Sequence, residues 1–355
     1  MLILSFFNDV VLKKRNGLAF IILSLSLAAA LVLAVGIGAV RVAPISLFRY
    51  ILHHAGLRSI PLPDARDITI LILLRLPRIL AAMLVGSSLA VCGVVMQGLF
   101  RNPMASPEIL GISAGGSLGA VIAITTGLAS WSLYTMPVLT IAGALLSAAC
   151  IYLLSTSRGA TSLLYIVISG MAISSLFNGL TSALLLFAKQ YEVSQFIFWT
   201  MGGLDGRSWQ HILFSAPVLI PGIIVLSFFS RELNLFTLGE EAALSLGMRV
   251  ERTKRLLLAL AAIVTGVAIA VSGPIGFVGL LIPHLFRFII GPDHRSLIPA
   301  SALGGALFLV LCDLLGRAIL PPFEIRVGII TAILGSPYLL SLIVRMQRRT
   351  VRGAR

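Results

Sequence analysis

The chain has 355 residues, of which 58% are hydrophobic and only 11% charged, and its mean hydropathy is +1.04. An ordinary soluble domain carries roughly 25% charged residues, so this composition argues against a soluble enzyme and predicts an all-α polytopic membrane protein. At about 20 residues per span the length accommodates roughly eight to ten helices, with no room for a nucleotide-binding domain, and the net charge of +14 is interpreted as a topology signal rather than a nucleic-acid surface.

Ten apolar runs predict ten membrane spans in a single domain, residues 1–355. They cover residues 17–40, 79–99, 108–127, 133–154, 162–187, 209–229, 256–272, 275–290, 297–316 and 327–344. Lys13, Lys14 and Arg15 precede the first run, and no clear small-residue cleavage site follows them, so we expect an uncleaved first span. Ten spans put both termini on one side, and the distribution of basic residues predicts that this side is the cytoplasm.

Six arginines before or at the start of the second span depart from that charge rule. They are Arg41, Arg49, Arg58, Arg66, Arg75 and Arg78. These arginines could bind an acidic partner protein or anionic lipid head groups, or they could be no more than the solvated ends of helices.

The turn after the second span runs from Gln97 to Gly111. Ser106 is placed as an N-cap, with Pro107 at the first helical position. Gly111, Gly115 and Gly119 then recur every four residues, a spacing that lets helices approach closely.

Two further segments carry glycine and proline inside apolar runs, residues 271–276 and 335–337. Irregular backbone at membrane depth is tolerated only where protein or a water-filled cavity satisfies its polar groups. We therefore expect breaks in these spans and a pathway through the bundle.

A polar island, Gly239 to Gly247, lies in the loop of about residues 231–255 and cannot cross hydrocarbon. Residues 240–246 are good helix formers, with Glu240 and Glu241 at the positive end of the helix dipole and Gly247 as a stop. The pattern predicts a short helix at the water face, either a docking element or a solvated loop.

Chemical motifs are sparse. The sequence has no phosphate-binding loop and no cluster of His and Cys with metal-ligand spacing. Its three cysteines are widely spaced in apolar runs, and its five histidines are interpreted chiefly as polar residues at helix ends. Asp313 is the one acid well inside a predicted span, and Arg317 at i+4 suggests a structural ion pair. We expect no catalytic residues and no metal site.

Five strings together resemble the FecCD-type permeases, the membrane subunits of type II ABC importers for ferric siderophores, haem and cobalamin. They are Arg75–Arg78, Gln97–Gly111, Gly239–Gly247, Ser272–His284 and Glu324–Pro337, spread from about residue 70 to 345 in the order and spacing of the family.

The resemblance implies a homodimer around a central pathway in the bacterial inner membrane, two ATPase subunits and a periplasmic substrate-binding protein. The chain itself would bind no cofactor, since ATP and Mg²⁺ would be held by the ATPase. The resemblance matches the polar island to the helix that docks on the ATPase, with Gly239, Glu240, Glu241, Ala242, Leu246 and Gly247 as coupling residues. It matches Arg75, Arg78 and Arg317 to arginines that contact the binding protein.

The sequence departs from the family pattern at two places. Arg326 stands where the family usually has proline, which puts the local bend in doubt and adds a candidate docking charge. Glu240 and Glu241 stand where a single Glu is usual, which leaves open which carboxylate faces the ATPase.

The leading hypothesis is an importer permease for an iron complex, a ferric siderophore first and haem second, working by alternating access. Cobalamin or an oxyanion on the same fold is the alternative. From other classes, an ATP-independent secondary carrier usually buries more carboxylates than this chain has, and a membrane enzyme needs a convergent set of acid, base and nucleophile that is missing.

Overall fold

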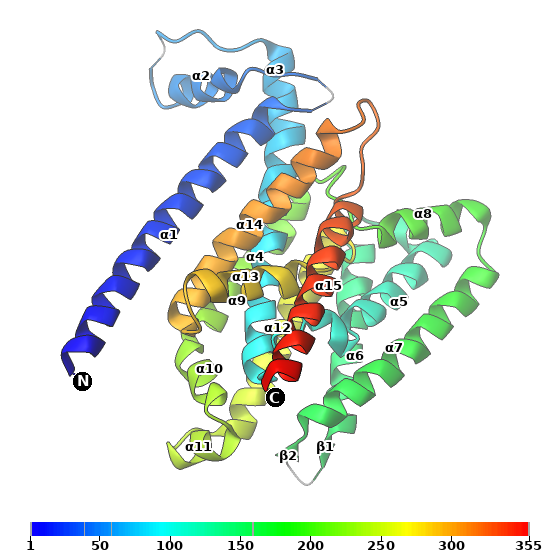
Figure 1. The fold of residues 1–355 in the computed structure, drawn as a ribbon. Helices are drawn as coiled ribbons and strands as arrows, with labels where there is room; N and C mark the ends of the chain where they lie inside the picture. The colour runs from blue at the N-terminus through cyan, green and yellow to red at the C-terminus, as the bar shows by residue number, and fades with distance from the viewer. Residues whose placement is uncertain (1, 39, 58, 158–159, 354–355) are drawn as a thin grey trace.

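The computed structural model describes residues 2–38, 40–57, 59–157 and 160–353, which form a bundle of α-helices (Figure 1). Arg58, one of the outer arginines singled out above, lies outside the described residues. The helices that carry the apolar runs are α1 (Leu2–Gly36), α4 (Leu76–Leu99), α5 (Ile112–Thr125), α6 (Thr135–Ser155), α7 (Leu163–Leu186), α9 (Trp209–Phe228), α12 (Val250–Ser272), α13 (Val278–Ile289), α14 (His294–Ala318) and α15 (Val327–Gly353).

Shorter elements connect these helices. They are α2 (Pro44–His54), α3 (Ala65–Thr69), a π-helical segment (Ile70–Arg75), 3₁₀ turns at Pro107–Leu110 and Leu128–Ser130, a hairpin of β1 (Thr156–Ser157) and β2 (Ala160–Thr161), α8 (Gln190–Thr200), α10 (Ser230–Thr237) and α11 (Glu240–Ser245).

The ten predicted spans are confirmed as ten apolar helices. Among the described residues, seven helical stretches are long and apolar enough to cross a membrane, and three shorter ones, Ile112–Thr125, Val278–Ile289 and Val327–Leu342, complete the set. In Figure 1, α11 and the β1–β2 hairpin lie at one end of the molecule and α2 lies at the other. These are called below the α11 end and the α2 end. The chain termini lie toward the α11 end.

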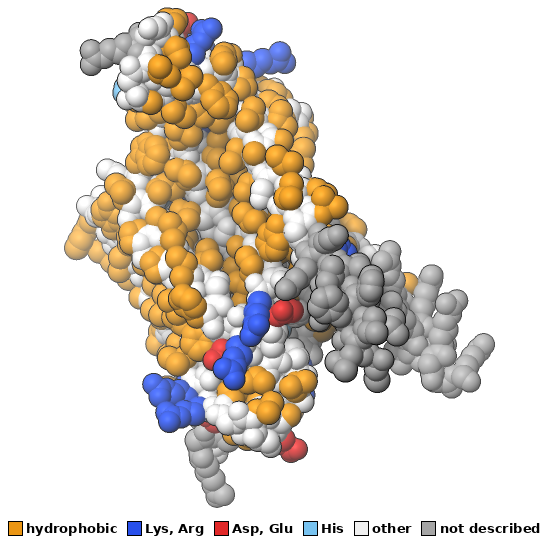
Figure 2. All heavy atoms as spheres, turned by 90° about the vertical axis from the view of Figure 1, so that its left-hand side faces the viewer, with side chains coloured by type: hydrophobic (Ala, Val, Ile, Leu, Met, Phe, Trp, Pro, Cys, Tyr) orange, Lys and Arg blue, Asp and Glu red, His pale blue; other side chains and the backbone are white. Residues whose placement is uncertain are grey.

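The surface has the distribution that a membrane protein requires. Figure 2 shows one face on which hydrophobic side chains cover the middle, while Lys and Arg gather toward the two ends. Large apolar residues such as Leu153, Leu164 and Leu213 are exposed along the spans. In a lipid bilayer these side chains face hydrocarbon rather than water.

Helix α4 lies at the centre of the bundle and packs against α9, α12, α13 and α14. Its approach to α13 depends on glycine, because a Cβ on Gly93 would overlap the carbonyl oxygen of Gly279. The predicted close approach of the 111–119 run is confirmed for two of its glycines. A Cβ on Gly115 would overlap the backbone at Gly143 of α6, and one on Gly119 would overlap the backbone at Leu139. Gly111 has a different use, since its φ of +65° ends the 3₁₀ turn before α5.

The second span is longer than its sequence indicates. Helical structure is continuous from Ala65 to Leu99, whereas the apolar run predicts a span of residues 79–99. Arg75 and Arg78 do not end the helix, because both find hydrogen-bond partners inside the protein, as described below. The π-helical segment ends at Arg75, just before the first turn of α4, which contains Pro77, a residue that has no N–H to donate.

Two local predictions need correction. Ser106 precedes the helical turn with Pro107 in place, but its side chain forms no capping hydrogen bond, the turn is 3₁₀, and α5 starts only at Ile112. The expected break at 335–337 is absent, since α15 continues through Pro337. Gly335 serves packing instead, because a Cβ there would overlap the Phe277 side chain. The break at 271–276 is confirmed as the connection between α12 and α13, with Gly273 at φ +67°.

Candidate functional site

The polar island forms the tip of the α11 end. Gly239 has a φ of +108° and Gly247 a φ of +82°, conformations that favour glycine, and α11 extends from Glu240 to Ser245 between them. The predicted short helix is therefore confirmed, ending one residue earlier than expected. Ala243 turns inward and is buried, Ala242 is half-buried, and Glu241 is exposed.

Three leucines around α11 face away from the bundle. Leu238 is 64% exposed, Leu244 57% and Leu246 61%. Together with Glu241 they form a surface that we call the α11 patch. A polar tip beyond the membrane normally exposes few large apolar side chains, so this patch has the character of a protein contact surface.

Beneath the patch lies a buried lysine. Lys254 of α12 is 1% exposed, and its ammonium donates to Glu240 at 2.7 Å, to Glu251 at 3.1 Å and to the carbonyl of Thr161 at 3.0 Å. Glu251 in turn accepts a hydrogen bond from the Thr161 amide at 3.1 Å. We call these four residues the Lys254 cluster.

The cluster joins α11 and the first turns of α12 to a segment that is distant in sequence, β2 of the hairpin between α6 and α7. A buried ammonium with two carboxylates and a carbonyl has its three donors satisfied. The two glutamates of the island consequently differ. Glu240 is held by Lys254, whereas Glu241 forms no ion pair among the residues that the structure describes.

A second polar link holds α10 against α14. Asn234 donates to Asp293 at 2.7 Å and accepts from the His294 amide at 3.0 Å, and Asp293 caps α14 by accepting from the Arg295 amide at 3.0 Å. Burial alone would raise the pKa of Asp293, but the hydrogen bonds from Asn234 and Arg295 outweigh it and hold that pKa below its ordinary value. The base of α11 is thus tied to the bundle on two sides.

At the α2 end, two of the three predicted docking arginines are buried. Arg75 and Arg317 are each 5% exposed. Arg75 donates to the carbonyls of Val35 and Val40, and Arg317 donates to those of Ala34 at 3.3 Å and Ile37 at 2.9 Å. The two cations thus lie on the carbonyl end of α1, where the helix dipole favours positive charge.

Arg78 occupies the space between α4 and α14. It contacts Asp313 at 2.8 Å and Glu324 at 2.7 Å, and Asp313 also contacts Arg317 at 3.0 Å. The predicted Asp313–Arg317 pair is therefore confirmed and forms part of a larger network. A direct contact of Arg75 or Arg317 with a partner would require this packing to open.

Arg326 holds the start of α15. Its guanidinium contacts Asp205 at 2.9 Å and lies over the Phe198 ring at 5.3 Å. The neighbouring Gly328 donates to the carbonyl of Gly202 at 3.1 Å. The arginine in the usual place of proline therefore binds the loop that follows α8, and α15 begins directly after it at Val327.

The part of the chain that the structure describes contains no group of three or more His, Cys, Asp or Glu side chains placed to hold a metal ion. Sequence reasoning singled out α11 but missed the Lys254 cluster. The i, i+3 spacing of Glu251 and Lys254 on one helix was a readable signal. The contact between Lys254 and Thr161, 93 residues earlier, left no signal in the sequence.

The model of the FecCD transport family matches residues 26–345. The chain belongs to this family. It is 45% identical over 270 residues to a cobalamin import system permease protein of Halobacterium salinarum, covering 76% of this chain and 72% of that protein. It is 42% identical over 279 residues to a hemin transport system permease protein of Yersinia pestis, covering 78% of this chain and 83% of that protein.

A solved structure described as an inward-facing conformation of a putative metal-chelate type ABC transporter superposes with a TM-score of 0.81 at 33% identity, over 94% of this chain and 99% of that chain. The FecCD chain described here is accordingly a multi-pass membrane permease of an ABC importer. Permease subunits of this family are not enzymes themselves, and they work with ATPase and substrate-binding partners.

Proposed function

We propose that this FecCD permease moves an iron complex across the inner membrane by alternating access, as a homodimer with two ATPase subunits and a periplasmic binding protein. A ferric siderophore is the first candidate substrate and haem the second. The likeness to a metal-chelate type transporter and to a hemin permease supports this class. Cobalamin is the alternative on the same fold, supported by the relative from Halobacterium salinarum, and an oxyanion stands behind it.

The α11 patch is the proposed contact with the ATPase, and it is the observation that carries the coupling mechanism. Helix α11 and its flanking residues expose leucines and Glu241, which forms no ion pair among the described residues. The Lys254 cluster ties the same helix to α12 and to the β hairpin. A push on α11 by the ATPase would therefore reach α12 and the α6–α7 connection directly. Of the coupling residues, Glu241 and Leu246 are assigned to the partner contact, Glu240 and Ala242 to its support, and Gly239 and Gly247 to the turns.

The α11 end is accordingly proposed as the cytoplasmic end, with both termini inside, and the α2 end as the docking face for the binding protein. Arg75, Arg78 and Arg317 remain the proposed basis of that face. Arg78→Gln tests whether Arg78 contacts the binding protein directly or only supports the structure of the permease. Lower affinity for the binding protein with unchanged thermal stability of the permease supports direct contact, and loss of both assigns Arg78 a structural role.

The decisive experiment is reconstitution in proteoliposomes with the ATPase and the binding protein of the same importer. ATP-dependent uptake of a ferric siderophore, haem and cobalamin is compared at equal concentration. Glu241→Gln should weaken ATPase binding without altering permease stability, whereas Glu240→Gln should lower both. Uptake that persists without ATPase and binding protein would identify an ATP-independent carrier and overturn the proposal.

A further inference from the structure

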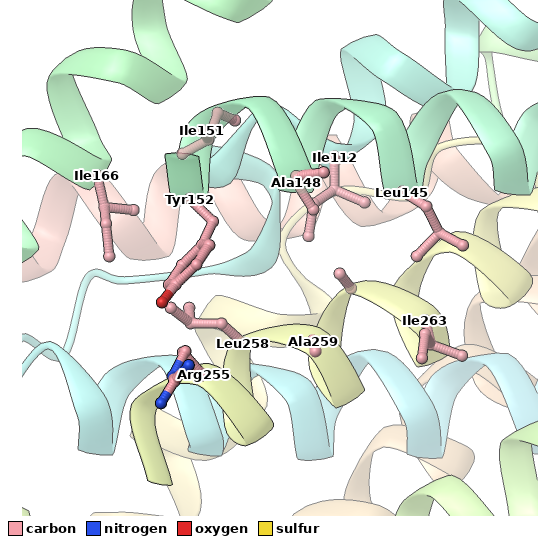
Figure 3. Close-up of a pocket in the computed structure, with 12 residues that line it drawn as sticks. Ile112, Leu145, Ala148, Ile151, Tyr152, Ile166, Arg255, Leu258, Ala259 and Ile263 are labelled. Atoms are coloured by element: carbon pink, nitrogen blue, oxygen red, sulfur yellow. The ribbon is translucent and has the colours of Figure 1, made fainter. Parts of the chain in front are cut away.

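An apolar groove of about 370 Å³ lies between α6 and α12 (Figure 3). Its floor is buried and its rim is exposed. The lining residues that matter here are Leu145, Ala149 and Tyr152 of α6 and Arg255, Ala259 and Ile263 of α12.

Both polar side chains of the groove lie at one end of it. Figure 3 shows the phenol oxygen of Tyr152 pointing toward the guanidinium of Arg255, with only apolar side chains beyond them. Tyr152 lies near the last turn of α6, and Arg255 lies in the second turn of α12. Since α6 leads into the β hairpin and α12 follows α11, this polar end faces the α11 end of the molecule.

Arg255 is exposed and, within the described part of the chain, forms no ion pair or hydrogen bond. The neighbouring Lys254 has three partners, so acidic side chains are present nearby but do not reach Arg255. An unpaired guanidinium and a phenol at the rim of a hydrophobic groove leave several hydrogen-bond donors free for an anion.

The length and the apolar walls of the groove fit the acyl chain of a lipid. From Arg255 to Ile263, α12 rises by about 12 Å at 1.5 Å per residue, which is the length of a substantial part of an acyl chain. Arginine and tyrosine are favoured at the boundary between head groups and hydrocarbon. A soluble polar substrate would find no partner along the apolar walls. A phospholipid fits both parts of the groove, because its phosphate can bind Arg255 at the polar end while its acyl chain lies along the apolar walls.

We propose that this groove binds an anionic phospholipid, with the phosphate on Arg255 and Tyr152 and an acyl chain between α6 and α12. The charge of Arg255 selects anionic over zwitterionic lipid, and Ala149 and Ala259 leave the space that the chain fills. The site is separate from the α11 patch and does not depend on which substrate is transported.

Native mass spectrometry of the full-length chain, purified in the assembly in which it is expressed, tests the proposal. After delipidation the protein is titrated with phosphatidylglycerol or phosphatidylcholine. Phosphatidylglycerol should bind more tightly, and Arg255→Gln should weaken it about fivefold, the effect of one basic residue near anionic lipid. Arg252→Gln is the matched control, because Arg252 is an exposed arginine one turn earlier that does not line the groove.

A second pair of variants tests the groove itself. Ala259→Phe should fill it and reduce the binding of phosphatidylglycerol, while Ala142→Phe, on an exposed part of α6 outside the lining, should not. Equal binding of both lipids, or equal losses with Arg252→Gln and Arg255→Gln, would overturn the proposal. So would a change of oligomeric state with Ala259→Phe at unchanged lipid binding, since a second copy of the chain would then cover the groove.

Discussion

Replacing Lys254 by methionine tests the link between α11 and the bundle. Methionine keeps most of the length and apolar packing of the lysine stem and carries no ammonium group. The variant leaves Glu240, Glu251 and the Thr161 carbonyl without their shared donor. Removing one partner of a fully buried pair costs about 3–5 kcal/mol.

The expected loss here is smaller, because the carboxylates are partly hydrated. The side chains of Glu240 and Glu251 are 34% and 31% exposed, while that of Lys254 is 1% exposed. Water can therefore replace part of the interaction that each carboxylate loses with the ammonium group. We expect the free energy of unfolding to fall by about 2–3 kcal/mol.

Equilibrium unfolding in mixed micelles measures this change, and co-purification with the ATPase measures its effect on coupling. Arg252→Met is the control, since Arg252 is exposed on the same helix and forms no ion pair among the described residues. We expect that control to change stability by less than about 0.5 kcal/mol. A Lys254→Met variant as stable as the Arg252→Met control would refute the view that the cluster holds α11 in place.

Three further substitutions, and one control, probe the packing and the ion pairs with the same unfolding assay. Gly93→Ala places a methyl group against the α13 backbone and should destabilise the fold by several kcal/mol or prevent folding. Its control is Gly179→Ala, where the added methyl group meets nothing within 4 Å, and the stability should stay unchanged or rise by up to about 1 kcal/mol. Equal effects of the two variants would contradict the close approach of α4 and α13. Asp313→Asn removes the acid shared by two arginines and should cost about 3 kcal/mol, and a neutral result would show that the buried pairs are dispensable. Arg326→Ala breaks a half-exposed pair and should cost only about 0.5–1 kcal/mol, so a loss above about 2 kcal/mol would mean that the arginine does more than hold the start of α15.

The number and order of the spans were predictable because each depends on a local property. A run of about 20 apolar residues is sufficient to specify a membrane helix, and all ten runs became helices. The short helix at 240–245 was equally local, since glycine at both ends and good helix formers between them act within one turn. The family was recognisable because its strings keep their order from about residue 70 to 345.

The roles of the charged residues were decided by tertiary structure. Arg75 and Arg78 were predicted to contact the binding protein, but inside the bundle Arg75 donates to the carbonyls of Val35 and Val40, and Arg78 pairs with Asp313. A charge can be buried only where a partner from another element reaches it, and the sequence does not state that partner.

The same reason separates the two glutamates of the island. Glu240 and Glu241 are adjacent and chemically identical, so composition, spacing and family pattern treat them alike. Only the fold brings Lys254 and Thr161 to one of them and leaves the other exposed beside Leu244 and Leu246. The sequence alone determined that a helix would stand in water at this position, and the packing of α12 and the β hairpin against it decided which face is held and which is free to meet a partner.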